Sequence, residues 1–430
     1  MTRVVVIGAG VAGLVASLRL TRGGAAVTLV HKGVGGLQLS QGTVDILGYS
    51  PERVLEPLAA LDAFAAANPG HPYVLLKDSV REGADFLAEL VGPALLVGDA
   101  AVNLQLPTAV GAVRPTALAA PSMIAGACVA GAQFLIVGFK QLKDFYPELV
   151  AENLSRTTLP AGGTLAARHH VLDFPAIAGE ADSSGLAYAR ALDDPAKRRA
   201  LVAALRPLVQ QGEVVGLPAF LGLDDHGAWS EIEEELGTEV FEIPLPPPSV
   251  PGMRLNRALT ALAKAAGVRV VPGGVAIGVE TADGAITAVV SEAAGGPRRY
   301  AADAVVLATG GFESGALALD SYGVVTETAL GLPLAVPDGP LVHGDYWGAA
   351  QPLFTVGVAV DADLRVVRPG TTEPVYPNLY AAGGILAGAT RWAEKSGEGI
   401  ALASAVRAAD AILAAAGVEQ ETSSIEGGAA

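Results

Sequence analysis

Apolar and polar residues follow one another along the chain in a pattern that predicts a parallel α/β fold. Residues 4–7 are a continuous apolar run, typical of a strand that is buried on both faces. Apolar residues then recur at helical spacing, and residues 26–30 form a second apolar run. Residues 304–308 and 378–382 have the same strand character. Because these runs lie far apart in the sequence, we expect a Rossmann-like domain with a mostly parallel, discontinuous sheet.

The intervening segments predict an inserted α/β region and irregular cap regions. Short apolar runs alternate with helical patterns between residues 133 and 241. The proline-rich stretch at residues 245–249 cannot be helical, and a helix is expected after it over residues 255–266. Asp283-Gly284 predicts the turn of an antiparallel hairpin. Further helices are expected over residues 52–67, 79–91, 196–209, 231–236 and 397–416.

The composition excludes several classes of protein. The 430 residues carry 28 Lys and Arg against 44 Asp and Glu, a net charge of −16, which argues against a general nucleic-acid binder. Only 17% of residues are charged and the mean hydropathy is +0.43, so a disordered chain is not expected. Cys128 is the single cysteine, which excludes an internal disulfide and an all-cysteine iron–sulfur cluster within this chain.

One uncharged stretch, residues 117–139, is long enough to cross a membrane. It is rich in Ala and Gly, contains Pro121, and has no flanking basic cluster. We therefore expect a helix entry followed by a buried strand at residues 134–137, and no direct membrane span.

The first glycine motif lies between a strand and a helix, which is the context in which such a motif indicates a nucleotide site. Gly8, Gly10 and Gly13 have the spacing that lets a backbone turn tightly, approach a phosphate and pack a helix on a strand. The N–H groups at the start of that helix would face the anion. The motif predicts a dinucleotide or flavin site, and the alternative is a tight turn without a ligand.

The acidic residue expected at the end of the second strand is missing, and His31-Lys32 stands in its place. Three interpretations stay open: a mononucleotide flavin needs no ribose clamp, the two residues bind a ribose phosphate, or FAD is held by other groups. A solvated basic dipeptide is the structural alternative.

Three more glycine-containing segments fit the same architecture. Thr309-Gly310-Gly311 and Ala382-Gly383-Gly384 end two predicted strands with residues too small to block a planar ring. Gly397-Glu398-Gly399 opens the last helix, whose N-terminal partial charge would favour a reduced, anionic flavin. The alternative role of Glu398 is to cap that helix.

With these motifs in place, the chain resembles two-dinucleotide-binding flavoproteins related to fumarate reductase and succinate dehydrogenase. More specifically it resembles the B subunits of anaerobic glycerol-3-phosphate dehydrogenases. The resemblance rests on residues 40–47, 70–73, 245–255 and 307–315, in that order along the chain. It implies an FMN flavoprotein, with FAD as second choice, and implies that Ser40 and Gly42 contribute to the flavin site.

The resemblance also implies an activity and partners. The complex would oxidise sn-glycerol 3-phosphate to dihydroxyacetone phosphate and pass electrons to quinone. The partners would be a sister flavoprotein subunit and a membrane-bound iron–sulfur subunit, so the chain would be cytoplasmic and peripheral to the membrane. The missing acid at His31 agrees with FMN, and the single Cys128 agrees with clusters in a partner chain.

The chain also departs from relatives of this kind. Gln351-Pro352 and Val356-Gly357-Val358 stand where fumarate-reductase-like chains carry a histidine and a glycine pair, so their dicarboxylate chemistry is not carried over. Residues 387–396 are more charged than the glycine-rich form associated with these B subunits.

Alcohol oxidation requires cations for the substrate phosphate and a base for the hydroxyl proton. The candidate cations lie beside turn- or glycine-rich sequence: Arg114, Arg254, Arg391 and Lys395. His343 and His71 are the candidate bases. Each of these residues has a structural salt bridge or hydrogen bond as its alternative role. His169-His170 has no partner at metal-ligand spacing, so no metal is expected.

The resulting division has a flavin-binding domain in three parts, residues 1–48, 251–312 and 371–418. Cap regions cover 49–130 and 313–370, an inserted α/β region covers 131–250, and residues 419–430 are expected to be a disordered tail. Three functions stay open: a subunit with its own substrate site, an electron-relay flavoprotein, or an assembly subunit with an empty nucleotide site. An FAD-dependent fumarate-reductase-like oxidoreductase is a further alternative.

Overall fold

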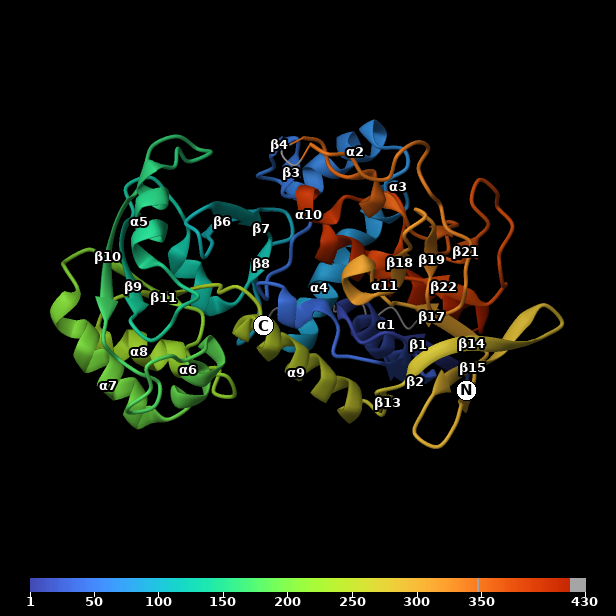
Figure 1. The fold of residues 1–430 in the computed structure, drawn as a ribbon, viewed down its shortest axis with the longest axis horizontal. Coiled ribbons are helices and arrows are strands. Elements are labelled where there is room, and N and C mark those ends of the chain that lie inside the picture. Colours follow the sequence, from blue (N-terminus) through green and yellow to red (C-terminus); the bar gives the residue numbers. More distant parts are fainter. Residues whose placement is uncertain (346–347, 418–430) are drawn as a thin grey trace, which may run out of the picture.

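The computed structural model describes residues 1–345 and 348–417, and a five-stranded parallel sheet lies at its centre (Figure 1). The strand order is β13-β2-β1-β17-β22. The strands are β1 (Arg3–Ile7), β2 (Ala26–His31), β13 (Arg269–Pro272), β17 (Ala304–Leu307) and β22 (Leu379–Ala381). Val4–Ile7 of β1 are buried because the strand is paired on both sides, with β2 and with β17. The predicted discontinuous Rossmann-like α/β fold is confirmed.

Helices and a small antiparallel sheet contact this central sheet. Helices α1 (Val11–Arg22), α4 (Val80–Val91), α9 (Val250–Ala265) and α11 (Gly397–Ala415) pack against one another. Strands β14 (Val275–Ala282), β15 (Ala285–Glu292) and β16 (Arg298–Ala301) contact β2, β17 and β1. The predicted hairpin turn joins β14 to β15, with φ of +51° at Asp283 and +78° at Gly284. Both angles lie in the left-handed region that a two-residue hairpin turn requires.

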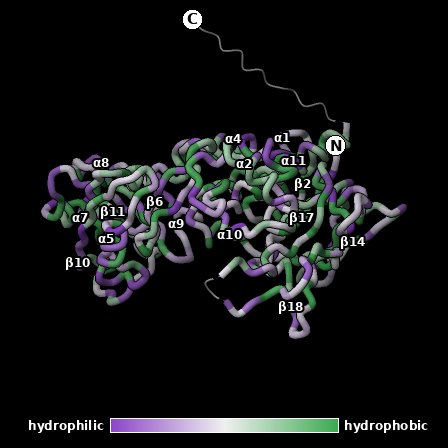
Figure 2. Tube along the Cα trace, turned by 90° about the horizontal axis from the view of Figure 1, so that it is seen from above, coloured by the Kyte–Doolittle hydropathy of each residue, from purple (hydrophilic) through white to green (hydrophobic). Residues whose placement is uncertain are grey.

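The inserted region is a second α/β unit with its own parallel sheet. Its strand order is β10-β9-β11-β12, and every neighbouring pair is parallel. The strands are β9 (Gln133–Phe139), β10 (Ala166–Leu172), β11 (Val214–Pro218) and β12 (Val240–Ile243). The helices are α5 (Pro147–Arg156), α6 (Gly185–Ala191), α7 (Pro195–Leu205) and α8 (Ala228–Leu236). This unit buries a hydrophobic cluster separate from that of the central sheet, and the two bodies lie side by side (Figures 1 and 2).

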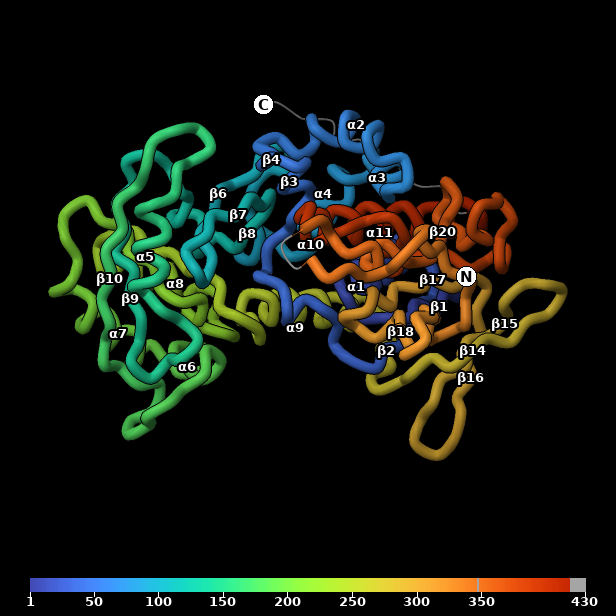
Figure 3. The backbone as a smooth tube through the Cα atoms, turned by 45° about the horizontal axis from the view of Figure 1, so that its top comes forward, coloured from blue at the N-terminus to red at the C-terminus, as the bar shows by residue number. Residues whose placement is uncertain are grey.

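Helix α9 joins the two cores (Figure 3). Val250 at its start belongs to the cluster of the inserted unit, while Leu259 and Ala263 belong to the cluster of the central sheet. The helix begins five residues earlier than the hydrophobic pattern predicts. Ser249 caps it, because its Oγ accepts a hydrogen bond from the Gly252 N–H at 3.3 Å. The proline-rich connector before it is non-helical, as predicted.

The uncharged stretch at residues 117–139 does not form one long helix. It contains the short strand β8 (Leu118–Ala119), a 3₁₀ helix at Pro121–Gly126 and the buried strand β9. The predicted helix entry is therefore a 3₁₀ helix, and the predicted buried strand is confirmed. Over the described parts of the chain, no helix has the length and apolar character needed to cross a membrane.

Short elements connect the two units and cover the central sheet. The helices among them are α2 (Pro57–Ala67), α3 (Tyr73–Leu76) and α10 (Arg391–Glu394). The small strand pairs are β3 (Tyr49–Ser50) with β4 (Glu52–Arg53), β5 (Val97–Gly98) with β8, β6 (Leu104–Pro107) with β7 (Val113–Thr116), β18 (Leu317–Leu319) with β19 (Val325–Glu327), and β20 (Ala359–Val360) with β21 (Val366–Val367). The helix expected to start at residue 52 starts at Pro57, after strand β4. The predicted tail, residues 419–430, lies outside the described residues.

Candidate functional site

The first glycine motif forms the turn between β1 and α1, and two of its glycines are required by close backbone approach. A Cβ on Gly13 would lie 1.9 Å from the carbonyl oxygen of Gly8, and a Cβ on Gly8 would lie 2.2 Å from that of Ala308. These contacts bring α1 and β17 close to the end of β1. A Cβ on Gly10 would meet nothing within 4 Å. Gly10 therefore leaves open space at the N-terminus of α1, where an anion is favoured.

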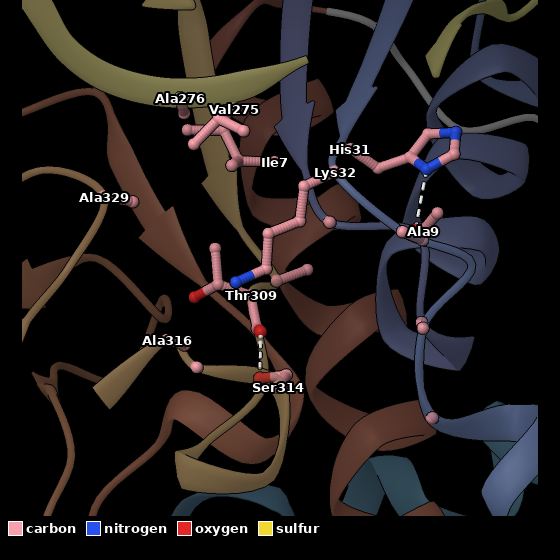
Figure 4. A pocket seen from close by; sticks show the side chains of 18 of the residues that line it. Ile7, Ala9, His31, Lys32, Val275, Ala276, Thr309, Ser314, Ala316 and Ala329 are labelled. Atoms are coloured by element: carbon pink, nitrogen blue, oxygen red, sulfur yellow. Dashed lines mark hydrogen bonds between the residues drawn. The ribbon is translucent and has the colours of Figure 1, made fainter. Parts of the chain in front are cut away.

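A pocket of about 510 Å³ opens from this turn (Figure 4). We call it the glycine-turn pocket. The ends of β1, β2 and β17 line it with Gly8, Gly10, His31, Lys32, Thr309 and Gly310. The cap and hairpin segments add the apolar side chains of Val275, Ala276, Ala316 and Ala329. Such a crevice at the carboxyl ends of parallel strands is where α/β proteins bind nucleotides.

Two polar side chains in the glycine-turn pocket have no acidic partner among the described residues. Lys32 extends into the pocket toward Thr309 (Figure 4). The Oγ1 of Thr309 is buried and makes no hydrogen bond. His31 is held differently, since its Nδ1 lies 2.7 Å from the carbonyl oxygen of Gly33. A buried hydroxyl without a partner is costly, and together with an ammonium group it favours an anionic ligand.

A second pocket, of about 460 Å³, lies between the central domain and the inserted unit. We call it the charged pocket. Its charged lining residues come from three separate parts of the sequence: Asp45, Arg114, and the stretch with Arg391, Lys395 and Glu398. Ser40 and Gly397 also line it, and Leu39 lines both pockets.

The three cations of the charged pocket differ in how they are paired. Arg114 makes a close ion pair with the buried carboxylate of Asp45. Arg391 makes an ion pair of 3.2 Å with Glu313, which lines the glycine-turn pocket, so this pair lies between the two pockets. Lys395 has no carboxylate partner within the described ranges, and its Nζ donates to the carbonyl oxygen of Trp392 at 2.5 Å.

Lys395 carries two further signs of a functional position. Burial, together with the charge of Arg114, lowers the pKa of its ammonium group. Its φ of +53° lies in the left-handed region, which costs a residue other than glycine on the order of 1 kcal/mol. Such strain concentrates at binding sites, where surrounding structure enforces it.

Glu398 is the second residue of α11 and faces the charged pocket. Burial raises the pKa of this carboxyl to about 7; the nearby charge of Asp45 adds to the shift, while Arg114 opposes it. A carboxyl with a pKa near neutral can exchange a proton at physiological pH.

Several predicted cofactor glycines serve packing. A Cβ on Gly42 would lie 2.6 Å from the carbonyl carbon of Pro251, and one on Gly383 would lie 2.8 Å from the Cβ of Ala12. A Cβ on Gly384 would lie 2.3 Å from Nη1 of Arg391, and one on Gly399 would lie 2.2 Å from the hydroxyl of Tyr73. Gly384 thus makes room for the Arg391 side chain, and the other three allow close contact between segments.

Arg254, one of the four predicted phosphate-binding cations, is not in either large pocket. It is buried and makes an ion pair of 2.7 Å with Glu242, and its Nε donates to the carbonyl oxygen of Gly222 at 2.9 Å. Burial alone would raise the pKa of Glu242, but the charge of Arg254 and hydrogen bonds from Arg254 and Ser122 lower it. Arg254 therefore stabilises the junction between the inserted unit and α9.

His71, a predicted base, is enclosed and fully hydrogen-bonded. Its Nδ1 accepts from the Tyr73 N–H at 3.0 Å, and its Nε2 lies 3.0 Å from Oε2 of Glu394. Burial alone would raise the pKa of Glu394, but hydrogen bonds from His71 and Thr390 hold it at about 2. Neither ring nitrogen of His71 is left to accept a proton from a substrate.

His343, the other predicted base, is exposed and does not line either pocket. Its backbone N–H donates to Oε1 of Gln351 at 2.7 Å, and its Nδ1 lies 3.3 Å from Nε2 of the same side chain. Trp392 lines the charged pocket, is 61% exposed and packs against Phe354. Asp45 is a site residue that the sequence motifs do not indicate.

Comparison with known proteins now places the chain in a family. A family profile described as an FAD binding domain matches residues 3–400. The chain is 32% identical over 422 residues to the probable B subunit of the anaerobic glycerol-3-phosphate dehydrogenase of Halobacterium salinarum, with 95% of this chain and 97% of that protein covered. It is 31% identical over 428 residues to the B subunit of the anaerobic glycerol-3-phosphate dehydrogenase of Yersinia pestis, with the same coverage.

This chain belongs to the family of anaerobic glycerol-3-phosphate dehydrogenase B subunits. The predicted resemblance and the predicted flavoprotein class are thereby confirmed. Among solved structures, the open conformation of a flavocytochrome c3 fumarate reductase has 12% sequence identity and a TM-score of 0.45, covering 96% of this chain and 78% of that chain.

Two of the positions at which this chain differs from fumarate-reductase-like chains, Gln351 and Gly357, make contacts that hold neighbouring segments in place. Gln351 holds the loop of His343. A Cβ on Gly357 would lie 2.4 Å from the carbonyl oxygen of Ile385, so this glycine allows two segments to approach each other. Neither residue lines the glycine-turn pocket or the charged pocket.

Proposed function

We propose that this chain is a flavin-bearing subunit that oxidises sn-glycerol 3-phosphate to dihydroxyacetone phosphate in the charged pocket. The observation that carries the proposal is the convergence of three cations and the carboxyl group of Glu398 in one pocket. This pocket adjoins the glycine-turn pocket through Leu39. Cations for a phosphate and an ionisable group for a hydroxyl proton are what this substrate requires.

Lys395 is the proposed anchor of the substrate phosphate. Its ammonium group is partly desolvated and has no carboxylate partner among the residues that the structure describes, so an anion gains the full interaction. Arg114 and Arg391 line the same pocket and add positive potential, although each is paired with a carboxylate.

Loss of the Lys395 ammonium group tests this assignment. A charge-assisted hydrogen bond is worth about 1.5–3 kcal/mol, so Lys395→Met should raise the KM for sn-glycerol 3-phosphate roughly 10- to 150-fold. Lys264→Met is the matched control, because Lys264 is exposed at the end of α9. Equal KM values for the two variants would contradict a phosphate role for Lys395.

The proposed cofactor is FMN, bound at the glycine-turn pocket. No carboxylate ends β2 to take the hydroxyls of an adenosine ribose, and Lys32 extends into the pocket instead. A phosphate monoester carries close to two negative charges, which suits the open N-terminus at Gly10, the Lys32 ammonium and the unpartnered hydroxyl of Thr309. When bound, the flavin would supply the acceptor for the two electrons of the alcohol.

FAD is the second candidate cofactor. The volume of about 510 Å³ and the apolar walls of the glycine-turn pocket favour it, because they could take an adenosine group. The description of the matching family profile favours it as well. In this case another group would hold the ribose.

Analysis of the released flavin distinguishes these candidates. The purified chain is denatured and its chromophore is separated against FMN and FAD standards. FMN near one per chain supports the proposal, and FAD supports the second candidate. Absence of flavin even after reconstitution would contradict both and favour an assembly role.

The proposed setting is a complex, as the names of the relatives imply. We propose a sister flavoprotein subunit and a membrane-bound iron–sulfur subunit that passes electrons to quinone, with this chain cytoplasmic and peripheral to the membrane. The single Cys128 supports iron–sulfur clusters in a partner, since this chain cannot supply four cysteines.

A substrate site in this chain predicts that sn-glycerol 3-phosphate alone reduces its flavin. The test mixes the isolated, flavin-loaded chain with substrate without oxygen and follows the visible absorbance of the flavin. Bleaching by sn-glycerol 3-phosphate but not by glycerol supports the proposal. A flavin that stays oxidised would instead favour the electron-relay alternative.

A further inference from the structure

Glu398 differs from every other carboxylate in or near the charged pocket. Asp45 is engaged on both oxygens, because Oδ2 pairs with Arg114 and Oδ1 accepts from Thr43 at 3.4 Å. Glu394 accepts from His71, Thr390 and Ser396. Glu398 makes no ion pair and accepts no hydrogen bond from a side chain in the described parts of the chain; its hydrogen bonds come from its own backbone N–H and from that of Asp45. No side chain therefore competes with a molecule in the pocket for its carboxyl group.

Four neighbouring elements bring ionisable groups to Glu398. Asp45 lies on the segment before β3, Arg114 on β7, and Lys395 just before α11, and all three line the same pocket. Tyr73 of α3 is the fourth group, and burial, with the charges of Glu394 and Glu398, raises its pKa well above the ordinary value. The N–H of Gly399 donates to the carbonyl oxygen of Asp45 at 2.9 Å, which fixes the start of α11 beside Asp45.

We propose that Glu398 accepts the hydroxyl proton of the alcohol substrate, with Lys395 holding the phosphate of the same molecule. This inference rests on the proposed function. The O–H bond of the secondary alcohol breaks and its proton passes to the Glu398 carboxylate. A bound flavin would accept the hydrogen of the carbinol C–H bond, with its electron pair, as a hydride. The electron pair left by the broken O–H bond would form the second C–O bond of the carbonyl of dihydroxyacetone phosphate.

The electrostatics of the pocket suit this role. Burial and the Asp45 charge bring the pKa of Glu398 to about 7, so the group is ionised in part at neutral pH and is a stronger base than an ordinary carboxylate. Arg114 limits the shift. Asp45 and Arg114 are therefore positioning residues that set when Glu398 is ionised. Neither candidate histidine competes for the role, because neither lines the charged pocket.

The first test separates binding from proton transfer. Calorimetry on the flavin-free chain measures the affinity for sn-glycerol 3-phosphate, and rapid mixing of the flavin-loaded chain measures flavin reduction. Glu398→Gln should keep the affinity within about threefold and slow reduction roughly 100- to 10,000-fold, the usual contribution of a general base. Glu234→Gln, on the exposed surface of α8, is the control and should change neither quantity.

The second test uses pH. The wild-type reduction rate should rise with pH through an apparent pKa of about 7, and this rise should be lost in Glu398→Gln. Asp45→Asn removes a charge that raises the pKa of Glu398, so the rise should move to lower pH. A carboxyl titration near pH 7, followed by infrared difference spectroscopy on the flavin-free chain, should be present in wild type and absent in Glu398→Gln.

The outcomes decide between the proposal and the function on which it rests. If Glu398→Gln reduces the flavin as fast as wild type with the same pH dependence, Glu398 is not the proton acceptor although the substrate site stands. If substrate does not reduce the wild-type flavin, the substrate site itself is refuted and the role of Glu398 with it. Glu398→Asp is the variant to use if Glu398→Gln does not fold. It keeps a carboxyl group and should reduce the flavin at a pH-dependent rate between those of wild type and Glu398→Gln.

Discussion

Replacement of Glu242 by Gln tests whether Arg254 is committed to the protein core. The Glu242 side chain is 0% exposed and its ion-pair partner Arg254 is 6% exposed. Its Oε2 accepts from Arg254 and from Ser122 at 2.6 Å, and its Oε1 accepts from Arg254 and from the Leu221 N–H at 2.7 Å. The introduced amide would carry no charge and would place an N–H₂ group where one of these oxygens accepts.

The expected cost follows from the buried guanidinium that loses its counter-charge. Removing one partner of a buried pair costs about 3–5 kcal/mol, because the remaining charge is neither paired nor solvated. Glu152→Gln is the matched control, since Glu152 pairs with Arg156 on an exposed helix surface and such pairs are worth about 0.3–0.5 kcal/mol.

Urea unfolding followed by circular dichroism measures both variants. A lower midpoint with an unchanged slope reports a loss of stability without a change in the unfolded state. A loss for Glu242→Gln no larger than that of Glu152→Gln would refute the reasoning. It would return Arg254 to the candidates for phosphate binding.

Three further predictions follow from other parts of the structure. Gly13→Ala should lose bound flavin and about 1–3 kcal/mol of stability, since its Cβ meets a backbone oxygen at 1.9 Å, whereas Gly70→Ala should retain both because its Cβ has open space outside the glycine-turn pocket. The pKa of Glu394 is lowered from 4.5 to about 2, so its ionised carboxylate stabilises the folded state by about 3 kcal/mol above pH 4.5, and this contribution is lost as the pH falls toward 2. Thermal unfolding of Glu394→Gln should lack this pH dependence. Burial raises the pKa of the Cys128 thiol to about 12, so thiol reagents at neutral pH should label it only after unfolding, as mass spectrometry would detect.

The sequence predicts the central domain well, because its signals are local. A strand paired on both sides must be apolar throughout, and residues 4–7 and 304–307 satisfy that rule wherever the rest of the chain lies. Gly8 and Gly13 are required by backbone contacts within one turn and with the neighbouring strand. Even the late start expected for α9 is a local error, since Ser249 and Pro251 are ordinary signals for the start of a helix.

The roles of the candidate site residues are harder to predict from the sequence, because these roles depend on partners that are remote in sequence. Arg114 and Lys395 come together only because β7 and the start of α11 border the same pocket. His71 is bound by Glu394, and Arg254 is bound by Glu242, and neither pairing has a sequence signature. A charged side chain looks the same in a sequence whether it faces a pocket or a buried counter-ion.

The sequence by itself therefore determined the family, the parallel α/β fold and the glycine turn. Only the tertiary structure decided which cations are free for a phosphate and which carboxyl can exchange a proton. The physical reason is that apolar periodicity and backbone geometry act over a few residues. The ionisation of Glu398 depends instead on burial and on charges that three separate segments bring into the same pocket.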